Sequence, residues 1–507
     1  MNASRQPLRM RTLAAAMALA LAGCAVGPTY QLPDVETPVA FKEGTGEWVK
    51  AVPADALERG PWWNLFNDPV LTELASQVEV SNQNVAAAVG AYRQARAIVA
   101  EQRAALFPTV DLTFGSTRSG TRGGSTSGGS SSTSTNTGTG TGTGTSSGTG
   151  TGTTTTTVSS GGSGSTRNSF QLGIGASWEP DVWGRLGRAV DSARAGEQAS
   201  AADLQSAKLS AQGELAVDYF NLRELDVQRA LQAQTIAGFE RTFNIATNRY
   251  NAGIVAKTDV LQAQTQLITA RGDILGIDRQ RAVLEHAIAV LVGRAPSNFA
   301  IAPRPVWQGT VPDVPFDVPS TLLQRRPDIA AAERRVAQAN EQVGIATAAL
   351  YPSLRLSASA GLGAARIGEL FSASALAWSI GASVAQTLFD AGGNRARVEA
   401  SRGALEQAAA RYRQTVLVAF QNIEDQLVAS RILQDQLALR QQAADAANLV
   451  EQQVLNRYLA GQVSFTEVVN AQITAQGARR TLVTAQSDRH VAAVSLIQAL
   501  GGGWRGL

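Results

Sequence analysis

The spacing of hydrophobic positions changes in the same way in each half of the chain. Stretches at about residues 69–106 and 320–349 are rich in helix-forming residues, and each ends near a proline, which removes a backbone donor and stops a helix. After each proline, apolar positions alternate with small or polar ones. This period of two predicts four β-strands, two in each half, each with one apolar face and one small polar face. The alternating segments are 110–114, 170–178, 354–362 and 378–384.

Each strand pair is followed by a very long stretch without proline. The run at about residues 186–250 predicts a helix of about 65 residues, which would be about 100 Å long. The chain then turns at Asn251-Ala252-Gly253, where Gly suits a helix C-terminus, and returns as a second helix over about 258–292. The second half repeats this hairpin over about 394–500, with its turn at Ala460-Gly461.

Apolar residues in the last long stretch recur on one helical face. Val416, Phe420, Ile423 and Leu427 are spaced by four, three and four, which is typical of helices that pack along their length. Ala is abundant elsewhere on these helices and permits close approach on more than one face. The sequence therefore predicts helices that pack side by side as a wall.

The two halves are copies of each other. Residues 104–108 (AALFP) match 348–352 (AALYP) at an offset of 244, whereas 248–253 (NRYNAG) match 456–461 (NRYLAG) at an offset of 208. The first copy is therefore 36 residues longer between these matches. A duplication with a period near 200 predicts a pair of structural units rather than a solenoid.

A block of Gly, Ser and Thr accounts for the extra length. Residues 123–166 contain no charge, no aromatic residue and a single Val. A segment with so little apolar surface cannot offset the entropy of ordering itself, so we expect residues 118–167 to form a disordered loop.

The first residues carry a targeting signal. Arg5, Arg9 and Arg11 precede the apolar run 13–22, which is too short to span a bilayer and predicts a signal peptide over residues 1–23. Cys24, the only cysteine, follows Leu-Ala-Gly, and this arrangement resembles a bacterial lipobox. We expect lipid attachment at Cys24, and acyl chains make a stable anchor.

The mature chain has no property that favours nucleic acid or catalysis. Without residues 1–23 the basic and acidic residues balance, and no basic tract remains. His286 and His490 lie on predicted helices without a second ligand at i+3 or i+4, which favours structural roles over a metal site. The GxGxG runs in the insert lack a strand-to-helix context for phosphate binding. We therefore expect no catalytic residue, metal or cofactor, and no nucleic-acid partner.

The targeting signal bears on the strands. Any one of them fits a soluble antiparallel sheet with one wet face as well as a membrane sheet. Membrane targeting and the Gly and Ser on the polar face favour membrane strands. Four strands cannot close in lipid, so copies must assemble: two copies supply eight strands and three supply twelve. The strands themselves do not choose between these numbers.

Several motifs, in order along nearly the whole mature chain, resemble the TolC-like outer-membrane efflux proteins, in particular their lipoprotein (NodT-type) branch. The resemblance implies a mainly α-helical homotrimer, with a twelve-stranded β-barrel in the outer membrane and a periplasmic α-helical barrel. It also implies a passive exit duct joined by a periplasmic adaptor protein to an inner-membrane pump of the RND type. The motifs are Cys24-Ala25-Val26-Gly27-Pro28-Thr29-Tyr30, residues 62–69 (WWNLFNDP), the two Arg-Tyr-x-x-Gly turns, residues 323–329 (LQRRPDI) and residues 499–504 (ALGGGW).

The resemblance also implies roles for the two turns. Asp259 and Glu467 each lie six residues after a turn glycine, where a helix dipole alone favours an acidic residue. The family narrows its pore here with an acidic ring, which maps onto Glu467 and Asn470, so one acidic residue per subunit remains. A family contact maps onto Tyr458 with Asp259 as its partner. The implied adaptor-docking tips are Ala252, Gly253, Ile254, Ala460, Gly461 and Gln462.

The expected organisation follows the repeat. A surface coiled-coil adhesin is the alternative to the duct, because it also combines long helices, strands and low complexity. It does not predict the internal duplication. The expected segments are a signal peptide (1–23), a lipid-anchored extended segment (24–68), repeat 1 (69–295, including an extracellular loop at 118–167), a linker (296–319), repeat 2 (320–500) and a tail (501–507).

Overall fold

The computed structural model describes residues 26–35, 41–42, 61–120, 166–307, 309–312 and 326–502. The expected signal peptide, Cys24 and nearly all of the Gly/Ser/Thr insert lie outside the described residues. The chain divides into two compact units. A helical unit comprises Met1–Ala104, Asp181–Tyr351 and Thr387–Leu507, and a strand unit comprises Ala105–Pro180 and Pro352–Gln386.

Both halves contain the predicted order of helix, two strands, long helix and returning helix. The first has α3 (Gln83–Ala104), β1 (Thr109–Gly120), β2 (Thr166–Trp178), α4 (Arg185–Asn251) and α5 (Lys257–Leu291). The second has α7 (Pro327–Ala348), β3 (Ser353–Ala364), β4 (Leu376–Ala385), α8 (Gly393–Leu459) and α9 (Phe465–Ala499). The duplicated plan is confirmed.

The two copies share one sheet and pack their helices against each other. β2 of the first copy pairs with β3 of the second, and α4 of the first packs against α7 and α9 of the second. The physical reason is that two strands or one helical hairpin bury too little apolar surface to be stable alone. Like elements of both copies therefore share one sheet and one helical core.

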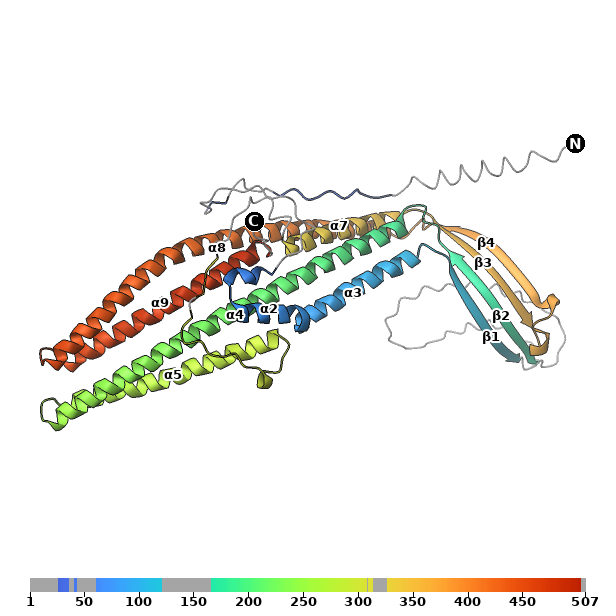
Figure 1. Ribbon diagram of the computed structural model, residues 1–507. Helices are drawn as coiled ribbons and strands as arrows, with labels where there is room; N and C mark the ends of the chain where they lie inside the picture. Colours follow the sequence, from blue (N-terminus) through green and yellow to red (C-terminus); the bar gives the residue numbers. More distant parts are fainter. Residues whose placement is uncertain are drawn as a thin grey trace, which may run out of the picture. The chain divides into compact units, whose positions relative to one another are not determined.

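The strand unit is a four-stranded antiparallel meander in the order β1-β2-β3-β4, with consecutive strands adjacent (Figure 1). Leu112 is paired with Ile174, which is paired with Ala360, and Ala360 is paired with Trp378. The neighbouring row is Asp111, Gly175, Ser359 and Ser379. Because directly paired residues point to the same face, one face of the sheet is apolar and the other is small and polar, as predicted.

The apolar face of the sheet is uncovered in the single chain. Leu112 and Trp378 are each 72% exposed and Ile380 is 79% exposed. β1 and β4 are the edge strands and lack a second neighbour within the described sheet. A patch of this kind marks a surface that meets lipid or another protein.

The stretch expected as one helix over 69–106 is two helices, α2 (Pro69–Ser81) and α3. Asn82 is extended and separates them; its Oδ1 accepts from the backbone N–H groups of Asn84 and Val85, 2.9 and 3.1 Å away. Its Nδ2 donates to the carbonyl of Leu291 at the end of α5, at 2.8 Å. The break between α2 and α3 therefore allows Asn82 to bind the C-terminal end of α5. The matching helix α7 begins at Pro327, directly after the extended residue Arg326.

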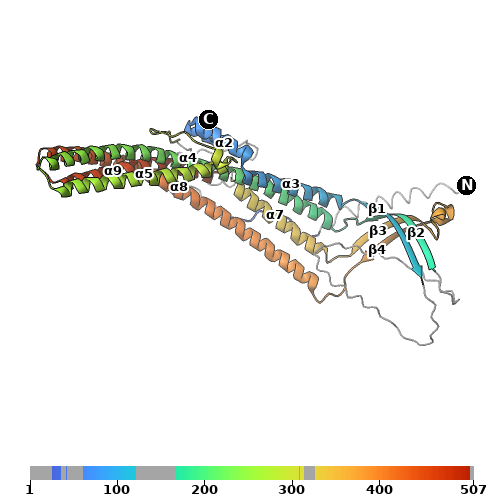
Figure 2. The same ribbon diagram turned by 90° about the horizontal axis from the view of Figure 1, so that it is seen from below.

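The long helices are as predicted. α4 and α8 have 67 residues each and the returning helices have 35 each, so each long helix spans about 100 Å. α4 packs against α5, α9 against α8, and α4 against α9, so the hairpins lie side by side in the order α5, α4, α9, α8 (Figure 1). Figure 2 shows α4 and α5 running together to their shared turn. α5 and α8 are thus the free edges of a helical wall.

The helical core lies where α2, α4, α5, α7, α8 and α9 meet. Val416, Phe420, Ile423 and Leu427 are all buried there, which confirms the predicted packing face of α8. Phe220 contacts Phe66 of the short helix η1 (Trp62–Phe66), with ring centroids 4.9 Å apart. Among the described helices, none is apolar over a length sufficient to cross a membrane.

The N-terminal segment is fixed along this core. The Val26 amide donates to the carbonyl of Trp183, at 3.2 Å, just before α4. The Tyr30 hydroxyl donates to Glu333 on α7. Gly27 has φ +125°, and a Cβ there would lie 2.7 Å from the Gly344 Cα. Only glycine fits at this position, which explains its place in the Val-Gly-Pro-Thr-Tyr motif.

Candidate functional site at the hairpin turns

The first turn ends α4 with a standard C-terminal motif. The Gly253 amide donates to the carbonyl of Tyr250 at 2.8 Å, and the Ile254 amide donates to that of Arg249 at 2.9 Å. Gly253 has φ +73°, the left-handed conformation that this Schellman motif requires. Ala252, Gly253 and Ile254 are all exposed.

The second turn repeats the first. The Gly461 amide donates to the carbonyl of Tyr458, the Gln462 amide donates to that of Arg457, both at 2.9 Å, and Gly461 also has φ +73°. Ala460, Gly461 and Gln462 are exposed. The six predicted docking residues are therefore accessible in two equivalent turns.

A small apolar core joins the two turns. Ala246 of α4 and Ala263 of α5 pack with Tyr458, Phe465 and Val468 of the second hairpin, and all five are buried. The ring of Tyr458 meets that of Phe465 edge to face, with centroids 5.5 Å apart. The tips of the two hairpins are therefore in direct contact within one chain.

Arg249 clamps the second turn. Its Nη1 donates to the carbonyl oxygen of Tyr458 at 2.7 Å, and its Cζ lies 4.7 Å from the centroid of the Tyr458 ring. The carbonyl belongs to the last turn of α8, where a cation is favoured by the helix dipole, and the ring adds a cation–π interaction. The sequence alone does not predict this role for Arg249; the repetition of Arg-Tyr in both turns is the one local signal for it.

The expected contact between Tyr458 and Asp259 is not made as a hydrogen bond. Tyr458 is 3% exposed, and its hydroxyl has no hydrogen-bond partner within the described part of the chain. Burial raises the pKa of Tyr458; Arg249 opposes this shift, and the charge of Asp259 adds to it. Arg249 has taken the backbone and ring of Tyr458, so the two hairpins are held by a different residue from the one expected.

The proposed ring residues are exposed on the returning helix. Glu467 and Asn470 lie at the start of α9, one turn apart and therefore on the same face. Neither side chain makes a hydrogen bond or ion pair with another described residue. No cluster of His, Cys, Asp and Glu suited to a metal occurs among the residues searched, which are those the structure describes.

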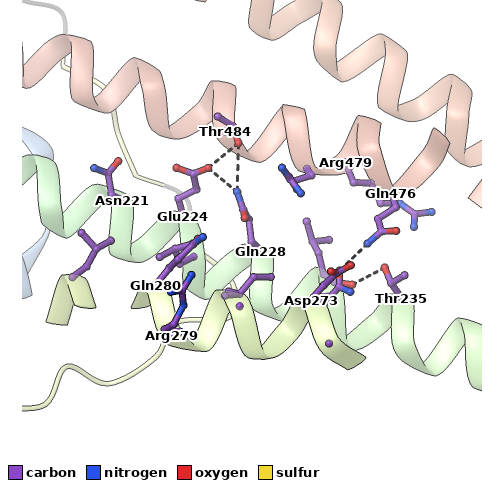
Figure 3. A pocket seen from close by; sticks show the side chains of 18 of the residues that line it. Asn221, Glu224, Gln228, Thr235, Asp273, Arg279, Gln280, Gln476, Arg479 and Thr484 are labelled. Atoms are coloured by element: carbon purple, nitrogen blue, oxygen red, sulfur yellow. Dashed lines mark hydrogen bonds between the residues drawn. The ribbon is translucent and has the colours of Figure 1, made fainter. Parts of the chain in front are cut away.

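A groove of about 930 Å³ separates the hairpins farther from the turns, between α4, α5 and α9 (Figure 3). Polar contacts cross it. Thr484 of α9 donates to Glu224 of α4 at 2.7 Å, and Gln476 donates to Gln232 at 2.8 Å. The hairpins are thus joined by hydrogen bonds along the groove and by apolar packing at the turns.

The chain has two long helical hairpins that lie side by side. A strand pair precedes each hairpin, and the two pairs form one sheet with an exposed apolar face. This combination defines a channel protein of the bacterial outer membrane. The model of the family described as "Outer membrane efflux protein" matches residues 144–294 and 318–502, which is most of the chain. The chain belongs to this family.

The matches to relatives extend over most of each chain. The pyoverdine export outer membrane protein OpmQ of Pseudomonas aeruginosa is 28% identical over 452 residues, 89% of each chain. The cation efflux system protein CusC of Escherichia coli is 26% identical, over 96% of this chain and 98% of its own. The solved outer-membrane channel OprN is 27% identical with a TM-score of 0.77, and the match covers 95% of this chain and all of that one. The protein is an outer-membrane efflux channel and not an enzyme.

Proposed function

We propose that three copies of this chain form the exit duct of a tripartite efflux pump, joined by a periplasmic adaptor to an inner-membrane pump of the RND type. The duct conducts passively, and the pump supplies the energy. The names of two relatives specify different cargoes, pyoverdine and cations, although both relatives match this chain over most of its length. This supports a duct whose cargo is selected by its inner-membrane partner.

The proposed assembly is supported by rows of exposed apolar residues on α5 and α8, the free edges of the helical wall. On α5, Leu261, Ile268 and Leu275 are spaced by seven and are 50–68% exposed, and on α8 Ile432 and Leu439 have the same spacing and are 44% and 64% exposed. A period of seven is that of helices packed along a seam. We infer that the α5 edge of one copy packs on the α8 edge of the next, a head-to-tail contact that closes a ring.

The sheet supports the same assembly. Edge strands cannot remain unpaired in lipid, so β1 of one copy must meet β4 of another. Three copies would supply twelve strands, enough for a barrel that leaves a passage, whereas eight strands fill their interior with side chains. The apolar face of the sheet would then meet lipid.

The lipid anchor fits the N-terminal segment. Val26, held at Trp183, lies two residues after Cys24 and close to the point where the chain passes from the strands into α4. We infer that acyl chains on Cys24 enter the outer membrane at this level, with the helices in the periplasm. The absence of an acidic residue after Cys24, where Ala25 stands, favours the outer membrane.

The aperture is proposed at the hairpin turns. Three copies would bring three Glu467 carboxylates and three Asn470 amides around one axis, and adaptor contact at the exposed turns would bias the hairpins to splay apart. The apolar core of the turns would separate, and the polar contacts along the groove could be exchanged with water.

Single-channel conductance in planar bilayers tests this proposal, with wild type beside Glu467→Ala and oligomer size measured by cross-linking. We expect a trimer with small, cation-preferring conductance, and weaker cation preference in the variant because one negative charge per subunit is lost from the aperture. Glu406→Ala, which removes an exposed carboxylate of α8 far from the turn, is the matched control. A trimer whose selectivity ignores Glu467→Ala rejects the aperture, and a chain that neither assembles nor conducts rejects the duct.

A further inference from the structure

The contact between Arg249 and Tyr458 has an unused counterpart in the same chain. The repeat places Arg457 at the position of Arg249, and Tyr250 at the position of Tyr458. Both counterparts are exposed, and neither side chain has a partner among the described residues. We propose that Arg457 of one copy holds Tyr250 of the next copy, in the way that Arg249 holds Tyr458 within one chain. This inference rests on the proposed ring of copies.

The two turns offer the same target. In each, the tyrosine carbonyl already accepts the amide of the turn glycine, at 2.8 Å for Tyr250 and 2.9 Å for Tyr458. A carbonyl oxygen has a second lone pair, and at Tyr458 Arg249 occupies it. Because both turns have the same Schellman hydrogen bonds, the carbonyl of Tyr250 is presented in the same backbone geometry as that of Tyr458, without a guanidinium on it.

The Arg249–Tyr458 pair and its counterpart Arg457 and Tyr250 differ in burial. Tyr458 is 3% exposed because the first hairpin covers it, whereas Tyr250 is 42% exposed. Arg249 is half-buried and Arg457 is exposed. The ring of Tyr250 and the guanidinium of Arg457 are therefore both available for the contact that Arg249 and Tyr458 make, but the single chain does not bring them together.

The order of the helices determines which chain completes it. Along the wall α5, α4, α9, α8, the contact inside the chain is α4 against α9. Replacing each element by its repeat counterpart turns this contact into α8 against α5. In a closed ring that contact lies between neighbouring copies, so Arg457 at the end of α8 reaches the first turn of the next copy. Three copies would then hold three clamps within chains and three between them.

Chemical cross-linking tests the contact directly. The double variant Tyr250→Cys with Arg457→Cys is expected to give a covalent trimer ladder with a short bismaleimide in the purified channel. Each single variant retains the native Cys24 and controls for reaction there. Tyr250→Cys with Arg440→Cys places the second thiol 17 residues earlier on α8, about 25 Å away, and should stay monomeric on a denaturing gel.

Conductance tests the role of the contact. Arg457→Ala and Arg249→Ala are both expected to raise single-channel conductance, because each substitution loosens a neighbouring pair of hairpins. Arg457→Lys should restore only part of the closure, because Lys lacks the planar guanidinium. Arg440→Ala should match wild type. If the wild-type trimer conducts, the absence of a cross-link in the double variant together with unchanged conductance in Arg457→Ala would overturn the contact while the duct stands. Failure of the wild type to form a trimer would overturn the duct itself.

Discussion

His490 shows how much the surroundings of one residue decide. It is 4% exposed on α9, and its ring lies 4.6 Å from that of Trp307 and 5.0 Å from that of Phe220. Its Nδ1 lies 2.8 Å from the carbonyl oxygen of Gln486. Burial lowers the pKa of His490, and the backbone hydrogen bonds only partly oppose this shift. The sequence predicts a structural histidine, and the structure places it in an aromatic cluster of the helical core.

This histidine should make stability depend on pH. Because its pKa is lower in the folded state than the ordinary value of about 6.5, the unfolded chain takes up a proton more readily as pH falls through that value. This contribution of His490 should lower the thermal midpoint, followed by circular dichroism in detergent, as pH falls from 7.5 to 5.5. Asp218, whose pKa burial raises to about 6, contributes in the opposite direction. His490→Phe should reduce this pH dependence, and His286→Phe, at the exposed second histidine, should keep it. An unchanged pH slope in His490→Phe would contradict the assignment.

At the scale of elements, the break between α2 and α3 is the informative departure from expectation. The composition of 69–106 favours one continuous helix, yet Asn82 ends the first helix and caps the second. Its side chain also satisfies the carbonyl of Leu291, where α5 ends. One buried amide thus fixes the junction of three helices.

Asn82→Ala should therefore destabilise the helical unit. Loss of the cap costs about 1 kcal/mol. Leaving the carbonyl of Leu291 without its donor adds about 1–3 kcal/mol. We expect a lower midpoint in denaturant titrations followed by circular dichroism. Asn84→Ala, two residues away and exposed, should change it little; equal midpoints for the two variants would show that the cap carries no such energy.

At the scale of the whole molecule, the single chain leaves both kinds of edge incomplete. α5 and α8 carry exposed apolar stripes, and β1 and β4 are open strand edges. Residues that are apolar, regularly spaced and uncovered are typical of surfaces completed by another copy. The proposed ring would cover both edges at once.

Charges on the stripes should prevent this assembly. Ile268→Glu on α5, or Leu439→Glu on α8, should raise the fraction of monomer in cross-linking and native mass measurements, because a carboxylate would be buried without a partner. Helix content should stay unchanged, since both side chains are exposed in the single chain. Gln262→Glu, exposed on another face of α5, controls for added charge. Full trimer formation by both stripe variants would place the contact elsewhere.

The sequence by itself determined the elements and their order. Period-two segments became the four strands, proline-free stretches became α4, α5, α8 and α9, and Gly253 and Gly461 ended the long helices at the expected turns. These features are local: the period of apolar residues and the conformational freedom of glycine act within a few residues of the chain. For the same reason the apolar face of each strand and the packing face of α8 could be read directly.

Only the tertiary structure decided which elements meet. Like parts of both repeats join one sheet and one helical core, Asn82 binds a carbonyl 209 residues away, and Arg249 rather than Asp259 holds Tyr458. Arg249 and Arg457 stand in the same local motif, yet one is used within the chain and the other is left open. A local motif specifies what a side chain can bind, but its partner depends on which hairpin lies beside it, and that is set by packing across the whole chain.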